Sequence, residues 1–214
     1  DRRIQADLNG DVTALILSDV IGDDLATIAS GPTVGPLGTA QDAIALLKQA
    51  DLWFQVPDSV RVHLQAAGSL PAVPDATNIL VGSNAKSVAA MAQAAPLAHV
   101  IATPIEGDVA QAARLICDHA GPGITVWGGE TTVLLRGTGR GGRNQELALR
   151  IAQEAGLRGW TDWVCLQGGS DGRDGPTDAA GGLVDQGTLG RVSDVEGLLA
   201  NNDSYAALAQ AGDL

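Results

Sequence analysis

Three carboxylates lie close together between residues 18 and 24, directly after a short apolar run. Asp19, Asp23 and Asp24 repel one another unless solvent separates them or a cation is shared, and an oxygen-rich loop of this kind suits Mg²⁺. We therefore take all three as candidate metal ligands, and Asp19 also as a substrate contact. Hydroxyls and amides of the same stretch could bind an anion, and the candidates are Ser18, Ser30, Gly31 and Thr33. A solvated acidic turn is the alternative.

A second candidate loop consists of Gly128, Gly129, Glu130, Thr131 and Thr132. Two glycines at the end of a strand let the backbone approach a ligand closely, and Glu130 is then a fixed carboxylate beside that ligand. The first four of these residues are candidate substrate or nucleotide contacts. A tight hairpin turn between two strands explains the same residues without a ligand.

A glycine-rich loop at residues 137–142 runs into a predicted helix that begins with Arg143. Unpaired N–H groups and the positive end of a helix dipole attract phosphate, and a guanidinium adds a bidentate donor. Candidate nucleotide contacts here are Gly141, Gly142 and Asn144. The loop also fits the G-x-G-x-x-G dinucleotide pattern. However, Asp162 precedes the next strand, where the pattern requires an acid at the end of that strand.

The fourth candidate loop, residues 168–178, alternates acids with glycines after a predicted strand. Its candidate site residues are Asp171, Gly172 and Asp174, the last two as substrate or nucleotide contacts. The loop is only superficially similar to a calcium-binding loop, because the twelfth position counted from Asp171 is Gly182 instead of a bidentate glutamate. Cation binding, sugar-hydroxyl binding and a plain Asx-turn loop all stay open.

Together these loops offer an anion-binding helix start, an arginine and many carboxylates, without a histidine or cysteine nucleophile. Such a set suits phosphoryl transfer, in which positioning and charge neutralisation supply most of the catalysis. It suits acyl transfer poorly, because no Ser-His-Asp arrangement is visible. The sequence contains neither a Walker P-loop nor the His-Arg-Asp loop of protein kinases. His63, His99 and His119 lie in separate segments, which argues against a histidine zinc cluster.

Alternating strands and helices must position these loops. Apolar runs predict strands at 12–17, 79–81, 99–102, 124–127, 131–135 and 163–166. Helical patterns predict helices at 40–50, 57–67, 85–95, 107–119, 143–155, 194–200 and 204–211. This order predicts an α/β fold with mostly parallel strands and flanking helices, whose ligands bind outside the carboxyl ends of the strands. Residues 70–78 contain two prolines and predict a linker and domain boundary.

Composition narrows the class of partner. The chain has 214 residues, 45% of them hydrophobic, which is enough for a sizeable core in one large domain or two small ones. A net charge of −12 argues against nucleic acid or an anionic membrane surface as partner. No apolar run approaches the ~18 residues of a membrane helix. Cys117 and Cys165 form no Cys-x-x-Cys pair, which fits a reducing compartment and predicts a cytoplasmic location.

Five stretches carry a resemblance to a known family. They are SDVIGDDLATIASGPTV at 18–34, GGETTV at 128–133, GRGGRNQELAL at 139–149, GSDGRDGPTDAAGGLVD at 169–185 and NNDSY at 201–205. In this order they resemble the bacterial and archaeal glycerate 2-kinases, whose carboxyl-terminal part is called the MOFRL domain and some of which are named hydroxypyruvate reductases. The resemblance implies ATP-dependent phosphorylation of D-glycerate to 2-phosphoglycerate with Mg²⁺. It also implies two Rossmann-like α/β domains with the active site in the cleft between them.

The resemblance also implies roles for residues and segments. Arg143 corresponds to the family's catalytic arginine and would stabilise the transferring phosphoryl group, and we take Asp171 as a second catalytic residue. The three loop aspartates 19, 23 and 24 would hold metal or substrate hydroxyls, whereas Glu130, Asp171 and Asp174 would line the cleft from the other domain. Residues 1–77 would be the end of the amino-terminal Rossmann-like domain, and residues 78–214 a MOFRL-type domain that is incomplete at its end.

The chain departs from the family in its length. Members are about twice as long, and their amino-terminal half carries a catalytic lysine and a glycine-serine-rich loop. Lys48 and Lys86 match neither motif. We therefore expect a carboxyl-terminal portion whose partner is the missing amino-terminal half, with no kinase turnover from these 214 residues alone. The sequence does not fix the oligomeric state, and a homo-oligomer is compatible with it. Two alternative functions are an NAD(P)H-dependent hydroxypyruvate reductase, for which Gly137, Gly139 and Gly142 would bind the cofactor, and a non-catalytic sugar-acid binding module.

Overall fold

A computed structural model of the chain describes residues 11–68 and 76–214. The chain forms two compact units, which we call unit 1 (Asp1–Ser83) and unit 2 (Asn84–Leu214). Most of the linker expected at 70–78 lies outside the described residues, and its last three residues begin a strand of unit 1. The boundary expected between residues 77 and 78 lies within that strand, and the division of the chain into the two units falls after Ser83.

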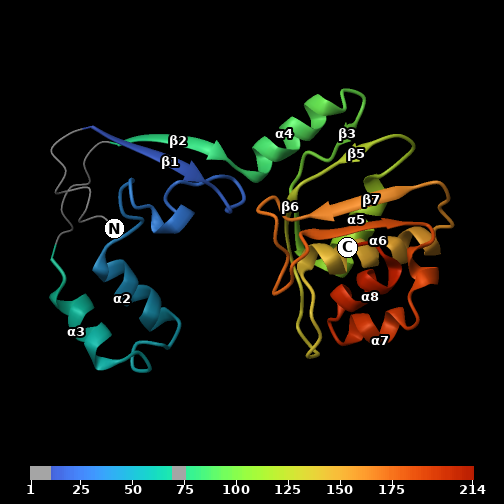
Figure 1. Cartoon of the computed structure of the whole chain (residues 1–214). Coiled ribbons are helices and arrows are strands. Elements are labelled where there is room, and N and C mark those ends of the chain that lie inside the picture. Colours follow the sequence, from blue (N-terminus) through green and yellow to red (C-terminus); the bar gives the residue numbers. More distant parts are fainter. Residues whose placement is uncertain (1–10, 69–75) are drawn as a thin grey trace. The chain divides into compact units, whose positions relative to one another are not determined.

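The described part of unit 1 contains two strands and the helical segments between them (Figure 1). Strand β1 (Val12–Leu17) pairs in parallel with β2 (Ala76–Gly82), and a register irregularity lies between Ile16 and Leu17. The short helix η1 (Ile28–Ser30) and the helices α2 (Ala40–Gln49) and α3 (Asp58–Ala66) separate these strands. A capping box explains where α2 begins: the amide of Asp42 donates to the Thr39 hydroxyl at 3.2 Å, and the amide of Thr39 donates to the Asp42 carboxylate at 2.7 Å.

Unit 2 begins with a layer of short parallel strands and their helices. Helix α4 (Asn84–Ala94) precedes β3 (His99–Val100) and β4 (Ile105–Asp108), and helix α5 (Val109–His119) precedes β5 (Thr125–Val126) and β6 (Gly129–Thr132). Strand β3 pairs in parallel with β5, and β4 pairs in parallel with β6. The remaining elements are α6 (Arg143–Leu157), the antiparallel strands β7 (Val164–Gly168) and β8 (Gly181–Asp185), η2 (Thr188–Arg191), α7 (Val195–Ala200) and α8 (Ser204–Ala211).

Helix α6 lies at the centre of unit 2. It contacts α5, β7, β8 and α8, and in Figure 1 it runs beside α5 with α8 and α7 below it. Eight of its 15 residues are buried, among them Leu147, Ala148, Leu149 and Ile151. Because the middle of α6 is fixed by this core, its first turn has a defined position on the unit.

The α/β fold with mostly parallel strands and flanking helices is confirmed by this architecture. Two strands were not expected. Strand β4 lies where the sequence predicts the start of a helix, and Gly107 within it has a φ of 83°. Strand β8 begins with Gly181 and Gly182, which are typical of a loop in sequence; a Cβ at Gly181 would collide with the carbonyl oxygen of Gln167 on the paired strand β7. None of the helices within residues 11–68 and 76–214 is long and apolar enough to cross a membrane.

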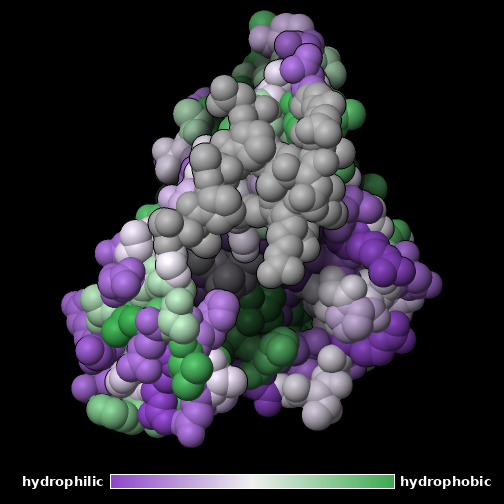
Figure 2. Space-filling view, turned by 90° about the vertical axis from the view of Figure 1, so that its left-hand side faces the viewer, coloured by the Kyte–Doolittle hydropathy of each residue, from purple (hydrophilic) through white to green (hydrophobic). Residues whose placement is uncertain are grey.

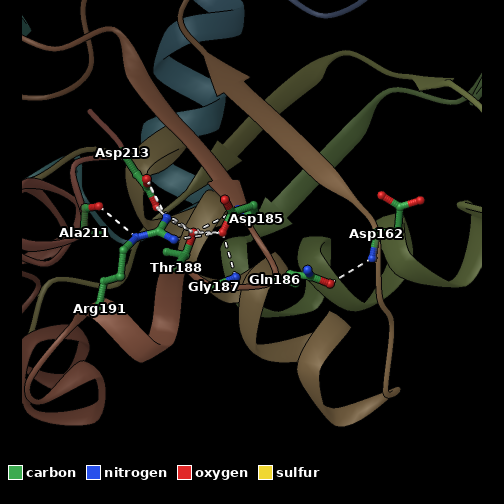
Figure 3. Close-up of polar contacts among 8 residues, drawn as sticks. All are labelled: Asp162, Asp185, Gln186, Gly187, Thr188, Arg191, Ala211 and Asp213. Atoms are coloured by element: carbon green, nitrogen blue, oxygen red, sulfur yellow. Dashed lines mark hydrogen bonds and ion pairs between the residues drawn. The ribbon is translucent and has the colours of Figure 1, made fainter.

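An arginine clamp fixes the end of unit 2 (Figure 3). The Arg191 guanidinium lies 2.8 Å from both carboxylate oxygens of Asp213 and 3.2 Å from Oδ1 of Asp185, and its Nε donates to the carbonyl of Ala211 at 2.9 Å. The buried Thr188 hydroxyl donates to Asp213 at 2.6 Å. Strand β8, η2 and the segment after α8 are therefore held together through one side chain.

Apolar side chains also reach the surface. Figure 2 shows hydrophobic residues among hydrophilic ones on the face that it presents. In unit 1 the outward residues of β1 and β2 alternate with more buried ones, and Leu15 and Leu17 are 70% and 75% exposed. Parallel strands are usually covered on both faces, so the β1–β2 pair differs from the usual pattern within the part of unit 1 that the structure describes.

Candidate functional site

Arg143 and Glu130 are brought together by the fold of unit 2. Arg143 is the first residue of α6, and Glu130 lies on β6. Nη1 of Arg143 is 3.1 Å from Oε1 of Glu130, and both side chains are about half exposed. The second and third candidate loops therefore meet at one ion pair, and a guanidinium with five N–H donors can contact an additional anion.

Asp174 caps the start of α6 from the fourth loop. Its carboxylate accepts the backbone N–H of Asn144 at 3.1 Å, the side-chain amide of Asn144 at 3.1 Å and the backbone N–H of Gln145 at 2.8 Å. Asp174 is only 3% exposed. This differs from the expectation that Asp174 lines a cleft: its charge faces the positive end of the helix dipole within the protein.

The amides at the start of α6 bear on the phosphate hypothesis. Residue 142 is the N-cap of α6, and the amides of Asn144 and Gln145 are the donors that a phosphate would normally take. Both amides already donate to Asp174, so phosphate binding at this helix start has no free amide at these two positions, and the nucleotide contact of Asn144 stays a prediction. The exposed group at this end of α6 is the Arg143 guanidinium.

A second layer of hydrogen bonds supports the cap. The buried Gln145 side chain donates to the Asp174 carbonyl at 3.3 Å and to the Thr177 hydroxyl at 2.8 Å, and that hydroxyl donates to the same carbonyl at 2.7 Å. Oε1 of Gln145 is buried and has no hydrogen-bond partner within the described residues. The fourth loop is thus fixed to α6 over its residues 174–177.

The glycine-rich loop packs against the turn at residues 201–204. A Cβ at Gly137 or Gly139 would collide with Asn201, and a Cβ at Gly141 would collide with the Ser204 hydroxyl. A Cβ at Gly142 would collide with the Asp174 carboxylate. Internal packing therefore accounts for these glycines, including the three that fit the dinucleotide pattern, without a bound cofactor.

The glycines of the second loop have a similar explanation. A Cβ at Gly128 would collide with the Asn84 side chain, and one at Gly129 would collide with the backbone of Ile105 on β4. Gly129, Glu130 and Thr131 belong to strand β6 and not to a loop after a strand, and Thr131 is buried. Glu130 lies opposite Glu106 of β4 in the parallel register.

Asp171 and Gly172 lie in an exposed turn after β7. The Asp171 carboxylate accepts the backbone N–H of Arg173 at 3.1 Å, which is an Asx turn. Gly172 has a φ of 80° and donates its N–H to the carbonyl of Gly169 at 3.0 Å. Asp171 is thus exposed, and its catalytic role stays a prediction.

Arg140, Asp178 and Tyr205 form a cluster that the sequence analysis did not identify. It links the glycine-rich loop, the fourth loop and the NNDSY motif. The Arg140 guanidinium lies 5.2 Å from the centre of the Tyr205 ring and donates to the carbonyl of Pro176 at 3.1 Å. The Tyr205 hydroxyl donates to the Asp178 carboxylate at 2.7 Å, and this hydrogen bond lowers the pKa of Asp178 and raises the pKa of Tyr205. The one sequence feature that could have indicated this cluster is the NNDSY stretch at 201–205, which resembles the family but to which no role was assigned.

The acidic loop belongs to unit 1 and forms local contacts there. The Asp24 carboxylate accepts the Thr27 hydroxyl at 2.6 Å and the amide of Ala26 at 3.2 Å, and the Thr27 bond is the main cause of a lowered pKa of Asp24. Asp23 has a left-handed φ of 55°. No group of three or more His, Cys, Asp or Glu side chains within residues 11–68 and 76–214 is arranged to hold a metal ion. The assignment of Asp19, Asp23 and Asp24 as metal ligands stays a prediction.

The remaining candidates of unit 1 have structural partners. The Ser18 hydroxyl donates to the carbonyl of Val20 at 3.1 Å, and the Thr33 hydroxyl donates to the side chain of Asn78 on β2. Ser30 is exposed and has a φ of 62°. A Cβ at Gly31, whose φ is 60°, would lie 2.9 Å from the carbonyl oxygen of Ala26, so the turn requires glycine. The contribution of these residues to ligand binding stays a prediction.

Family models match two parts of the chain. Residues 123–214 match the MOFRL family, and residues 4–65 match a domain of unknown function, DUF4147. The whole region around Glu130, Arg143 and Asp174 falls within the first match. The fold and this site define an α/β protein with a MOFRL family domain.

Known proteins that are similar to this chain bear the name glycerate kinase. A glycerate 2-kinase of Pyrococcus horikoshii is 36% identical over an alignment of 234 positions. The alignment covers 97% of this chain and 52% of the relative. The human glycerate kinase is 35% identical over an alignment of 264 positions, and this alignment covers 94% of this chain and 50% of the relative. A crystal structure of glycerate kinase from Thermotoga maritima has a TM-score of 0.78 and 33% identity, and the likeness covers 95% of this chain and 53% of that one. The chain is similar to these glycerate kinases over nearly its whole length, and it spans about half the length of these relatives.

Proposed function

We propose that this chain is the carboxyl-terminal portion of an ATP-dependent glycerate 2-kinase, which transfers a phosphoryl group to D-glycerate and gives 2-phosphoglycerate. The observation that carries the proposal is the half-exposed Arg143 guanidinium at the rigid start of α6, within the segment that matches the MOFRL family. The names of the relatives support the substrate and the reaction.

In this proposal Arg143 contacts the transferring phosphoryl group. Phosphoryl transfer spreads negative charge over the equatorial oxygens, and a planar guanidinium with several donors matches that distribution. Helix α6 fixes the residue from its buried middle, so the guanidinium is positioned before the ligand arrives. Preorganised charge of this kind stabilises a transition state more than a ground state.

ATP would be the phosphoryl donor and Mg²⁺ its counter-ion. Mg²⁺ in kinases is held by one or two carboxylates together with phosphate oxygens, so no three-carboxylate cluster is required. Exposed carboxylates of the type it needs are Asp171 in unit 2 and Asp19 in unit 1. The same proposal includes substrate contacts from four residues of unit 1, namely Ser18, Ser30, Gly31 and Thr33. It also includes an additional amino-terminal half as the partner of this chain and the cytoplasm as its location.

The proposal is tested first by ligand binding. Tryptophan fluorescence of the 214-residue chain is titrated with ATP and, separately, with NADH. We expect saturable binding of ATP, and we expect Arg143→Ala to weaken it by ~10-fold or more because a charge-assisted contact to phosphate is lost. Arg114→Ala is the matched control, because it removes the same charge from the exposed face of α5. Binding of NADH that ATP does not displace would favour the reductase instead.

Turnover gives the second test. In the full-length enzyme that contains this chain, Arg143→Ala should lower kcat by roughly 100-fold if the guanidinium acts on transition-state charge. A coupled assay of ADP formation that depends on D-glycerate measures it. Unchanged kcat would remove Arg143 from the catalytic group, and glycerate-dependent turnover by the 214-residue chain alone would contradict its assignment as a partial enzyme.

A further inference from the structure

Asn202 connects the glycine-rich loop to the first turns of α6, and the NNDSY motif to which it belongs has no role in the function proposed above. We infer that Asn202 is a positioning residue that sets the path of the loop into Arg143. The inference rests on the proposed function of Arg143, because it concerns the same site. Asn202 itself contacts no residue that we place against substrate.

All of the hydrogen-bonding capacity of the Asn202 side chain is used within the protein. Its Oδ1 accepts the backbone N–H groups of Arg136 at 2.7 Å and Gly137 at 3.0 Å. Its Nδ2 donates to the carbonyl of Leu134 at 3.2 Å and to Oε2 of Glu146 at 3.4 Å. The residue is 8% exposed. One side-chain amide therefore joins three backbone groups, at and just before the start of the loop, to a residue on α6.

Glu146 determines which way this amide faces. Glu146 lies on α6 one turn after Arg143, is buried, and accepts Nη2 of Arg150 on its Oε1 at 3.0 Å. Its other oxygen is an acceptor only, so the Asn202 side chain must present its NH₂ group there and its oxygen to the loop amides. The orientation of Asn202 is thus fixed by a charge on the same helix that carries Arg143.

The backbone of Asn202 also fits this role. Its φ is 55°, in the left-handed region that asparagine tolerates better than most residues. Neighbouring residues of the motif extend the contact: Asn201 accepts the amides of Thr138 and Gly139, and the Asp203 carboxylate accepts the amide of Arg140 at 3.1 Å. The turn at 201–203 is therefore a template along which the loop lies as far as residue 140.

Asn202→Asp and Asn201→Asp form a matched pair of variants that test the inference. Both add one negative charge on adjacent residues. Asn202→Asp replaces the donor that faces Glu146 by an acceptor, whereas Asn201→Asp keeps the acceptor that Thr138 uses. Titrated with ATP, the 214-residue chain should bind ~10-fold more weakly after Asn202→Asp and within ~2-fold of wild type after Asn201→Asp.

Rescue separates positioning from general damage. Adding Glu146→Gln to Asn202→Asp restores complementarity, because the introduced glutamine can accept from Arg150 and donate to the introduced carboxylate. The double variant should recover at least half of the ATP affinity that Asn202→Asp alone loses. Asn202→Gly, which keeps the left-handed backbone without the side chain, should weaken binding while thermal unfolding remains cooperative.

The outcomes distinguish the two levels of proposal. If wild type does not bind ATP, or binds it equally well after Arg143→Ala, the proposed function of the site fails. If wild type binds through Arg143 but the Asn202 variants bind as tightly as Asn201→Asp, the positioning role fails while the proposed function stands. Equal weakening by both aspartate variants would also overturn the positioning role, because added charge alone would explain it.

Discussion

At the scale of single residues, the ion pair between Arg143 and Glu130 has a functional meaning beyond stability. Both side chains are about half exposed, and pairs of this kind contribute only ~0–1 kcal/mol because water screens them. A phosphate group carries more charge and more acceptor atoms than one carboxylate. Under the proposed function, Glu130 would be a counter-ion that a phosphate ligand displaces, and it would hold the Arg143 guanidinium near its working position until then.

We predict that Glu130→Gln increases the affinity of the chain for ATP by ~2–5-fold, because the competing carboxylate is removed at a cost of at most ~1 kcal/mol. Glu106→Gln is the control, since Glu106 lies opposite Glu130 on the paired strand and the variant changes net charge equally. Fluorescence titration measures both. An equal gain in ATP affinity for the two variants would mean that the change in net charge, and not the loss of the ion pair with Arg143, is responsible.

At the scale of elements, the start of α6 depends on a residue 30 positions away in sequence. The buried carboxylate of Asp174 accepts hydrogen bonds from two backbone amides of the helix and from one side-chain amide. A buried charge with these partners is costly to disturb, because removing one side leaves donors unsatisfied in a low dielectric. Asp174 therefore stabilises unit 2 and at the same time presents Arg143.

We predict that Asp174→Asn destabilises the chain by ~2–4 kcal/mol, because an amide NH₂ group would face a backbone N–H where a carboxylate now accepts one. Asp171→Asn, in the same loop but exposed, should change stability by less than ~0.5 kcal/mol. Urea unfolding followed by tryptophan fluorescence gives both values. Similar losses for the two variants would contradict the capping role of Asp174.

The helices and most strands could be predicted because their periodicity is local. The helix predicted at 143–155 differs from α6 only at its carboxyl end, and the helix predicted at 204–211 is α8 with the same bounds. Strand β8 could not be predicted, since Gly181 and Gly182 carry a loop signal and are required by close contacts with Gln167 and Leu208. Those contacts exist only in the folded unit.

The site was predictable only in its exposed chemistry. Arg143 and Glu130 were identified as the charged groups of two loops, and the fold brings them together. The hydrogen bonds of the α6 amides to Asp174 and the orientation of Asn202 by Glu146 could not be predicted, because each joins residues that are 29 or more positions apart. A sequence pattern gives residue types and not the partner that each one finds.

At the scale of the whole molecule, the two units differ in the core that they contain. The large cluster of buried hydrophobic side chains lies in unit 2, whereas the buried hydrophobic residues among the described part of unit 1 are Ile28 and Trp53. Burial of apolar area is the main favourable term in folding. We therefore expect the stability of the described chain to reside largely in unit 2.

The two cysteines report on this unit alone. Cys117 and Cys165 are buried in the core of unit 2, and burial raises the pKa of each thiol to about 11. At pH 8 only about 0.1% of each would be the reactive thiolate in the folded state, compared with a pKa near 8.5 after unfolding. We predict that a thiol reagent at pH 8 labels both slowly without denaturant and rapidly in urea, with a midpoint that matches unfolding of unit 2. Rapid labelling of either cysteine without denaturant would contradict the packing described here.

Helix α6 has a consequence for genetics. Its first residue is the candidate phosphate-binding arginine, and Ala148, five positions later, has no exposed surface. In a growth selection, inactivating alleles at these two codons would give the same phenotype, although one removes a ligand contact and the other prevents accumulation of the polypeptide. Measuring cellular abundance beside growth would separate them, and libraries that aim to change substrate preference should randomise the exposed rim of this helix while leaving its core codons constant.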